Sequence, residues 1–344
     1  MIGALIGLFA PTAFVLDADT ANEMDDMYAV AHAVLDPDAD LLMLSSAHFN
    51  NTEIATKGRW HAYDMDGFVP VRASQAENER LLEALGDDTP ALLGADEMIG
   101  YSWGYFDGAP VPTAPAIDAI IARARALRGG ERLTVLSVGP LTNVAAAVIQ
   151  APDIAERLDL WWLGTKYDVD ARVWNKNSFN ARNDINALDH LLDRDDVRLT
   201  IMPGMVARKL MFARDRSAAC LAASPLPVAG MLADRWDFVG AGEEWTMWDL
   251  ALTMAVAHPE WATVETRAAP PENMADTVRV VTDIDAPAME RRFWALMRAD
   301  CPAAAPTATG GAHPRPRGPA GRRARRSRLA RRSRGTAWTA DGSP

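Results

Sequence analysis

The fold is decided by one stretch near the N-terminus, Phe14-Val-Leu-Asp-Ala-Asp-Thr-Ala-Asn-Glu-Met-Asp-Asp26. Its apolar start, Phe14–Leu16, predicts a buried strand that ends at Asp17. The segment that follows, Asp25–Leu35, has apolar residues at helical spacing. A strand that leads directly into a helix is typical of a βαβ unit, in which functional groups follow the carboxyl end of the strand. The stretch therefore predicts an α/β protein with its site just after the first strand.

The same alternation continues along the chain. The pattern predicts further strands at Leu41–Leu44, Leu133–Val138, Leu158–Leu163, Val197–Ile201 and Val278–Val281. It predicts helices at Ala114–Leu127, Thr142–Ile149, Asp184–Leu192 and Asp249–Ala257. Apolar strands that alternate with helices indicate a mostly parallel sheet covered on both faces. We expect a single Rossmann-like α/β open sandwich over residues 1 to about 300.

The charge composition indicates which partners the protein can bind. The formal net charge is −11, and ten of the 35 basic residues are arginines within residues 302–334, so the rest of the chain has 25 basic and 46 acidic residues. This acidic body argues against nucleic acid as its partner. Residues 301–344 are rich in Ala, Pro and Arg and predict a disordered tail.

Localisation is expected to be cytoplasmic. No apolar run reaches the roughly 18 residues of a membrane span, and Met1–Ala10 lacks the basic start of an export signal. Two cysteines, Cys220 and Cys301, are too few for a disulfide framework and fit a reducing compartment.

Four aspartates lie within ten residues after the first strand, at Asp17, Asp19, Asp25 and Asp26. Carboxylates brought together at a strand end repel one another and lose solvation, which costs several kcal/mol unless a cation neutralises them. Helix capping explains Asp25 or Asp26 alone but not the two aspartates on the strand side. Oxygen ligands in this number predict a site for a hard cation, Ca²⁺ or Mg²⁺.

Four segments, taken in order, resemble the nucleoside hydrolases. The Asp-x-Asp and Asp-Asp pairs of the first stretch are similar to the signature of that family. The other three segments are Val138-Gly-Pro-Leu-Thr-Asn-Val-Ala145, Ser178-Phe-Asn-Ala-Arg-Asn-Asp184 and Trp248-Asp-Leu-Ala251, with a looser likeness at Ser45–Asn50. The likeness extends from Phe14 to about Met297 and does not include the tail.

The resemblance implies calcium-dependent hydrolysis of the N-glycosidic bond of a ribonucleoside to ribose and free base. It implies that Asp19 binds Ca²⁺ and deprotonates the attacking water. Asp26 and Asp249 would be further calcium ligands, together with the backbone carbonyl of Thr142. Asp25 and Asn180 would hold the ribose hydroxyls, and Asn50 lies in the turn that corresponds to another substrate contact. Members of the family are usually homo-oligomers.

Three departures from the family pattern leave details of the site open. The spacer between Asp19 and Asp25 is two residues longer than usual and contains Glu23, an additional ligand or a surface acid. Ser178 stands where a glutamate usually holds the ribose 5′-hydroxyl, so Asn175 or Asn177 is a candidate substitute and a modified 5′ position stays open. Trp248 replaces a histidine that protonates the leaving base in pyrimidine-using relatives.

Indole cannot deliver a proton at neutral pH. Some purine-preferring relatives instead hold the base between aromatic rings, and Trp248 suits that arrangement, so the resemblance slightly favours a purine. The candidate aromatic neighbours for that pocket are Trp245, Trp236, Tyr101 and Trp103. His48 and His61 are the candidate replacement acids.

Three other interpretations remain at this point. Leu16-Asp-Ala-Asp-Thr20 also fits the strand-end motif of haloacid-dehalogenase-type phosphatases, but none of the four lysines stands in the context that this chemistry needs. A non-catalytic ribose- or metal-binding relative is a second possibility, motivated by Ser178 and Trp248. Hydrolysis of another N-glycoside is the third.

Overall fold

An eight-stranded sheet forms the centre of the computed structural model, which describes residues 10–50, 67–299 and 301. Neighbouring strands are parallel except for the pair at one edge, β11 and β12. The mostly parallel sheet that the sequence predicts is confirmed. The strands, in spatial order, are β11 (Ala262–Ala268), β12 (Thr277–Ile284), β8 (Arg198–Met202), β5 (Leu158–Leu163), β4 (Leu133–Ser137), β1 (Thr12–Ala18), β2 (Ala39–Ser46) and β3 (Ala91–Leu92).

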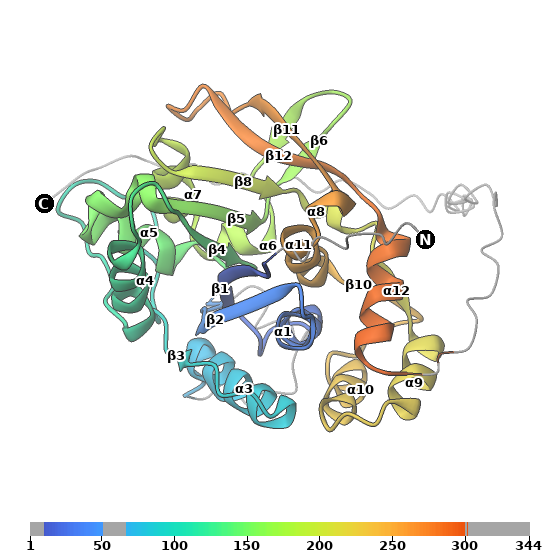
Figure 1. Cartoon of the computed structure of the whole chain (residues 1–344). Helices are drawn as coiled ribbons and strands as arrows, with labels where there is room; N and C mark the ends of the chain where they lie inside the picture. Colours follow the sequence, from blue (N-terminus) through green and yellow to red (C-terminus); the bar gives the residue numbers. More distant parts are fainter. Residues whose placement is uncertain (1–9, 51–66, 300, 302–344) are drawn as a thin grey trace, which may run out of the picture. The chain divides into compact units, whose positions relative to one another are not determined.

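The central strands are apolar on both faces because helices cover both. In β1, Phe14 and Leu16 belong to one core and Val15 to the other. One core lies under α1 (Asp25–Leu35), α3 (Pro70–Leu85), α8 (Gly204–Ala207), α9 (Arg214–Ala223), α10 (Val228–Phe238), α11 (Trp248–Ala257) and α12 (Ala286–Leu296). The other lies under α4 (Pro115–Ala126), α5 (Thr142–Gln150), the 3₁₀ turn η1 (Pro152–Arg157) and α7 (Ile185–Leu192) (Figure 1). This alternation within a strand is what a sheet buried on both sides requires.

Every strand and helix that the sequence predicts is present, with bounds that agree within two or three residues. The sequence patterns missed the polar helix α3 and the helices α9, α10 and α12. They also missed the short elements that border the carboxyl edge of the sheet. These are the hairpin β6 (Lys166–Asp168) and β7 (Val173–Asn175), α6 (Phe179–Asn183), and the hairpin β9 (Met211–Ala213) and β10 (Glu244–Thr246). The other missed elements are β3, η1, α8, β11 and the short turn η2 (Pro259–Trp261).

The cysteines differ from the expectation. The structure joins Cys220 of α9 to Cys301 in a disulfide, so the two thiols are not free. The two positions are 81 residues apart in the sequence, and only the packing of α12 against α9 brings them together. The predicted tail was residues 301–344; its first residue, Cys301, is instead tied to α9 by this disulfide, and residues 302–344 and most of Met1–Ala10 lie outside the described residues.

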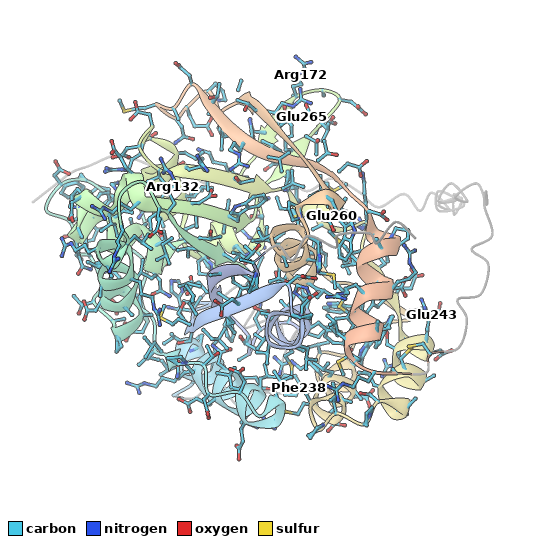
Figure 2. All side chains as sticks on the ribbon, viewed as in Figure 1. Arg132, Arg172, Phe238, Glu243, Glu260 and Glu265 are labelled. Carbon is cyan, nitrogen blue, oxygen red and sulfur yellow. A yellow bond between two sulfur atoms is a disulfide. The ribbon has the colours of Figure 1, made fainter. Side chains whose placement is uncertain are left out.

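Charged side chains cover the periphery of the described unit, among them Glu243, Glu265 and Arg172 (Figure 2). No helix in the described part of the chain is long and apolar enough to cross a membrane. The site is positioned by two features of the fold. The carboxyl ends of β1, β4 and β5 meet at one edge of the sheet, and the first turns of α1 and α11 carry aspartates toward it.

Candidate active site

A cavity of about 440 Å³ lies at the carboxyl edge of the sheet. Its floor is made by acids from the β1–α1 loop and from the start of α11, and its walls by loops after β4, β5 and β8. The lining residues are Asp19, Asn22, Glu23, Asp25, Asp26, Val138, Leu163, Gly164, Thr165, Lys166, Ser178, Phe179, Asn180, Gly204, Met205, Arg208, Thr246, Trp248 and Asp249. This place agrees with the rule that ligands of open α/β sheets bind beyond the carboxyl ends of the strands.

The structure brings most of the predicted site residues together here. Those that line the cavity are Asp19, Asp25, Asp26, Asn180, Trp248 and Asp249. Two others do not. Asn50 is exposed and donates to the Asp96 carbonyl at 2.5 Å, and Asn175 is exposed and accepts from the Asn177 amide at 2.9 Å.

Thr142 does not line the cavity either. Its hydroxyl donates to Asp184 Oδ2 at 2.7 Å and contacts His48 Nε2 at 2.9 Å. The residue that lines the cavity from this turn is Val138, whose carbonyl accepts from Asn180 Nδ2 at 2.5 Å. Thr142 opens α5, so its own carbonyl is directed along that helix.

Three carboxylates converge most closely. Oxygen atoms of Asp25, Asp26 and Asp249 lie within 4.8 Å of one another, and all three residues are buried. Asp25 Oδ2 accepts from the backbone N–H of Asp249 at 3.2 Å, which ties the first turn of α1 to that of α11. Asp25 Oδ1 and Asp26 Oδ1 have no hydrogen-bond partner among the described residues. Orphaned, buried carboxylate oxygens are the donor set that a hard cation such as Ca²⁺ prefers, so these residues fit calcium.

Burial and the neighbouring carboxylates raise the pKa values of these acids. Burial, with the neighbouring Asp26 carboxylate, raises the pKa of Asp19 well above its usual range. Burial raises the pKa of Asp25 to about 6, and burial together with Asp25 raises that of Asp26 to about 8. The pKa of Asp249 is also raised well above its usual range, first by burial and then by Asp25. The site therefore favours uptake of positive charge, as protons or as a cation.

The long β1–α1 loop is braced from outside, which sequence reasoning did not anticipate. Arg235 of α10 is buried and donates to the carbonyls of Thr20 and Glu23, each at 3.2 Å. The Thr20 hydroxyl donates to Asn78 Oδ1 of α3 at 2.5 Å. Glu23 itself lines the cavity, and burial raises its pKa well above the usual range. The longer β1–α1 loop is thus held in a fixed position beside the cavity.

Asp17 has a different place from the other aspartates. It does not line the cavity and accepts hydrogen bonds from Ser45 Oγ at 2.6 Å and Asn143 Nδ2 at 2.7 Å. Asn143 also donates to the Ser46 carbonyl at 3.0 Å and accepts from the Ala95 amide at 2.8 Å. Asp17 and Asn143 therefore join β1, β2 and α5 beneath the site.

The walls hold the residues at which the chain departs from the family pattern. Trp248 lines the cavity and meets Trp245 edge to face at 6.4 Å. The other candidate aromatics lie elsewhere. Trp236 is buried and donates to the Tyr28 hydroxyl, while Tyr101 and Trp103 stack on each other at an exposed loop.

Ser178 lines the cavity, but its hydroxyl accepts from the amides of Thr165 at 2.9 Å and Ala181 at 3.4 Å. His48 is buried away from the cavity, and burial lowers its pKa to about 4, so it is not a proton donor at neutral pH. His61 lies outside the described residues. Two cationic side chains that sequence reasoning missed, Lys166 and Arg208, border the cavity.

Part of the sequence and the fold as a whole are similar to those of known proteins. A segment of 139 residues, 39% of this chain, is 30% identical to the non-specific ribonucleoside hydrolase RihC of Escherichia coli O127:H6, and it matches 43% of the length of that relative. Among solved structures, an inosine-guanosine nucleoside hydrolase superposes with a TM-score of 0.60 at 15% identity, over 83% of this chain and 98% of its own. The type III effector protein XopQ, complexed with adenosine diphosphate ribose, superposes with a TM-score of 0.56 at 13% identity, over 83% of this chain and 92% of its own.

Fold, cavity and carboxylate cluster all correspond to one family. Residues 14–291 match the family model described as inosine-uridine preferring nucleoside hydrolase. The match contains every acid that lines the cavity and leaves no place for the phosphatase interpretation. The chain belongs to the inosine-uridine preferring nucleoside hydrolase family.

Proposed function

We propose that this chain hydrolyses the N-glycosidic bond of a ribonucleoside, in a calcium-dependent reaction, to ribose and free base. The observation that carries the proposal is the set of buried acids, Asp19, Asp25, Asp26 and Asp249, on the floor of a cavity of about 440 Å³. That volume lies in the range of small-molecule sites and suits a nucleoside. Membership of the family and the mixed acidic and aromatic lining support the same conclusion.

Calcium would be held by carboxylate oxygens of Asp19, Asp26 and Asp249. The neutral oxygen that completes this set is better supplied by the Val138 carbonyl than by Thr142, because Val138 lines the cavity and Thr142 does not. When bound, the cation neutralises the acids and lowers the pKa of a coordinated water.

The remaining steps depend on the side chains of the protein. Asp19 accepts a proton from the attacking water, whose oxygen forms the new bond to the anomeric carbon as the carbon–nitrogen bond breaks. The electron pair of the broken bond stays on the nitrogen of the leaving base, which takes up a proton from solvent water. Asp25 and Asn180 hold the ribose hydroxyls, and contacts that strengthen as the sugar gains positive charge contribute several kcal/mol. Trp248 stacks on the base and slightly favours a purine, because a two-ring base offers more area to the indole.

The decisive test measures release of free base and reducing sugar from a panel of purine and pyrimidine ribonucleosides, with calcium and with a chelator. We expect calcium-dependent turnover, and a loss of about 10²–10⁴-fold in rate for Asp19→Asn. The exposed Asp88→Asn provides the matched control and retains wild-type turnover. Wild-type rates in the Asp19 variant would reject the assigned base. Calcium binding without turnover on any substrate would instead identify a non-catalytic binder.

A second candidate substrate class follows from Lys166 and Arg208. Both are exposed cations at the cavity wall, near the position where Ser178 replaces the family's glutamate. They favour a ribose that carries an anionic group, such as a nucleoside 5′-phosphate or adenosine diphosphate ribose, the ligand of the related effector structure. The same assay with these compounds, compared between wild type and Arg208→Gln, separates the classes. A preference for uncharged nucleosides that the variant leaves unchanged would exclude the anionic substrate.

A further inference from the structure

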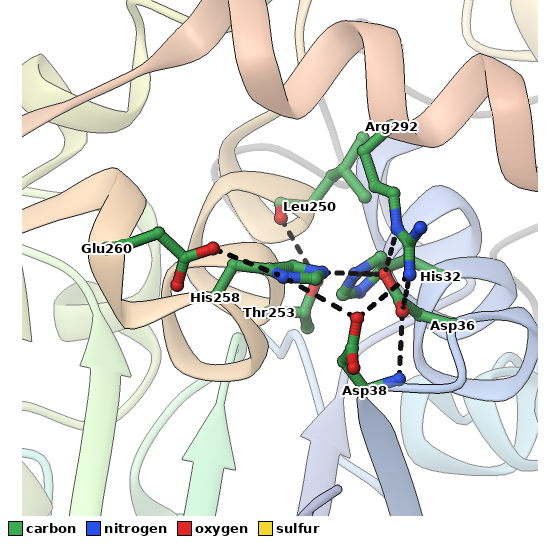
Figure 3. Close-up of polar contacts among 8 residues, drawn as sticks. All are labelled: His32, Asp36, Asp38, Leu250, Thr253, His258, Glu260 and Arg292. Atoms are coloured by element: carbon green, nitrogen blue, oxygen red, sulfur yellow. Dashed lines mark hydrogen bonds and ion pairs between the residues drawn. The ribbon is translucent and has the colours of Figure 1, made fainter. Parts of the chain in front are cut away.

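A second cluster of metal-ligand type lies at the other ends of the helices that carry the site aspartates (Figure 3). His32 is in the last turn of α1, Asp36 caps that helix, and His258 caps α11. Ligand atoms of these three residues lie within 4.8 Å of one another, and all three residues are buried. A helix rises about 1.5 Å per residue, so the cluster is roughly 15 Å from the acids at the start of α1. It belongs to a separate place in the molecule.

The distances suit one small ion. His258 Nε2 lies 2.8 Å and His32 Nε2 lies 3.2 Å from the same carboxylate oxygen, Asp36 Oδ2. A tetrahedral ion with bonds of about 2.0–2.1 Å places its ligand atoms roughly 3.3 Å apart. The two distances to Asp36 Oδ2 are close to this spacing, and the third pair of ligand atoms, from His32 and His258, lies within 4.8 Å.

His32 is the unexplained member of the cluster. Its side chain is fully buried, and neither of its ring nitrogens makes a hydrogen bond with any of the described residues. Nε2 is close to Asp36 but is not aligned with it for a hydrogen bond. A buried imidazole whose ring nitrogens make no well-aligned hydrogen bond is unfavourable, and a bound metal ion would remove that cost by accepting the lone pair of one nitrogen.

The surroundings orient the other two ligands. Arg292 of α12 donates from Nη2 to Asp36 Oδ1 at 2.5 Å and from Nε to Oδ2 at 3.0 Å, and so holds the carboxylate in place. His258 stacks on Trp261 at 4.0 Å, and its Nδ1 is 3.8 Å from Glu260 Oε1 and 4.0 Å from Asp38 Oδ2. Both of these distances are longer than a hydrogen bond, so the two carboxylates add negative charge near His258, and the stacking on Trp261 holds its ring.

Charge also favours a cation. Among the described residues, three carboxylates, those of Asp36, Asp38 and Glu260, lie around the cluster, together with the guanidinium of Arg292. The carbonyl ends of α1 and α11 point to the same place and add partial negative charge. The arginine alone leaves this excess uncompensated.

We propose that His32, Asp36 and His258 form a zinc-type site for a divalent transition-metal ion. Two imidazole nitrogens and one carboxylate oxygen suit Zn²⁺ or Co²⁺ and disfavour Ca²⁺, which takes oxygen ligands. The ion replaces the proton between His258 Nε2 and Asp36 Oδ2, and a solvent molecule completes four-fold coordination. Such an ion clamps the C-terminal ends of α1 and α11, whose first turns carry the active-site acids.

The test uses the full-length chain, free of affinity tag and treated with a chelator. Zn²⁺ binding is measured by titration calorimetry and metal analysis in excess calcium, and Co²⁺ binding by its visible absorption spectrum. We expect one zinc per chain, Co²⁺ bands typical of four-coordinate nitrogen and oxygen ligands, and a Tm that rises with Zn²⁺. His32→Gln and, independently, His258→Gln weaken zinc binding by at least about tenfold.

Two control variants separate this site from others. His190→Gln removes a half-buried histidine outside the cluster and retains zinc affinity. Asp249→Asn changes the oxygen cluster and also retains it. The proposal is overturned if wild type binds no zinc beyond background, or if both His32→Gln and His258→Gln bind zinc as wild type does. Either result would make the cluster a hydrogen-bonded ion pair only.

Discussion

Asp26→Asn is expected to stabilise the protein when calcium is absent, although it removes a proposed ligand. The asparagine has nearly the same shape as the aspartate and fits the same space. It removes one of the buried carboxyls that crowd the cavity floor and supplies amide hydrogens to the neighbouring Asp25 and Asp249. Repulsion that only a cation relieves in wild type is then reduced within the protein itself.

The magnitude follows from the raised pKa of Asp26. Burial and the Asp25 carboxylate raise this pKa from 3.8 to about 8, so the folded state resists ionisation across the neutral range. At pH 7 this carboxyl ionises in the unfolded chain, about three pH units above its ordinary pKa, but stays protonated in the folded chain. Each of these units favours the unfolded state by about 1.36 kcal/mol. Replacement of Asp26 by asparagine should therefore raise the free energy of unfolding at pH 7 by up to about 4 kcal/mol. In a chain of this size, each kcal/mol shifts Tm by roughly 2–4 °C.

The assay is thermal or denaturant unfolding of both proteins with chelator and with calcium, from pH 4 to pH 8. Because the folded pKa is raised, the contribution of Asp26 to stability is complete below pH 4 and is lost as pH rises toward 8. With chelator, the variant should therefore exceed wild type at pH 7 to 8, and the two curves should meet near pH 4. Calcium should raise the Tm of wild type far more than that of the variant.

Asp88→Asn, an exposed site, controls for the general effect of removing one negative charge and should change stability by no more than about 0.5 kcal/mol. The reasoning is refuted if Asp26→Asn is less stable than wild type in chelator at pH 8. It is also refuted if calcium stabilises both proteins equally, because Asp26 would then neither repel its neighbours nor bind the ion.

Three further predictions concern residues around the site. Trp248→Ala should lower kcat/KM for a purine nucleoside by about 2–12-fold, the equivalent of 0.5–1.5 kcal/mol of ring stacking, and an unchanged value would exclude Trp248 from the base pocket. Gly139→Ala would place a Cβ 2.9 Å from Asp19 Oδ1, whereas Gly129→Ala meets nothing within 4 Å. We expect Gly139→Ala to lower turnover by about 10²-fold because it displaces the Asp19 carboxylate. Gly129→Ala should leave kcat and KM unchanged. Asp17→Ala, which removes a buried acceptor and leaves the donors of Ser45, Asn143 and Ser137 unpaired, should destabilise the fold by about 1–3 kcal/mol in urea unfolding, and wild-type stability would contradict its structural role.

Local patterns were sufficient for the core of the fold. The strand before Asp17 and the helix after Asp25 are recognisable because burial on both faces makes the strand continuously apolar, and the helix repeats its apolar residues every three to four positions. The parallel sheet and the approach of Asp19, Asp25 and Asp26 to one edge follow from short-range sequence alone. The polar helix α3 was missed because few of its residues are apolar and buried.

Contacts between distant segments could not be predicted in the same way. Val138 lines the cavity and Thr142 does not, and Thr142 opens α5, whose carbonyls point along the helix axis. The cationic Lys166 and Arg208 stand in loops with no motif of their own.

The fold class, the acidic floor of the site and the family resemblance could be predicted from the amino-acid sequence, because these depend on neighbouring residues and on fixed spacing. Two other features became visible only in three dimensions: Arg235 braces a loop more than 200 positions earlier in the chain, and His258 meets His32 and Asp36. The physical reason is helix packing. α1 and α11 lie side by side, so residues at matching ends of two helices meet although no local pattern links them.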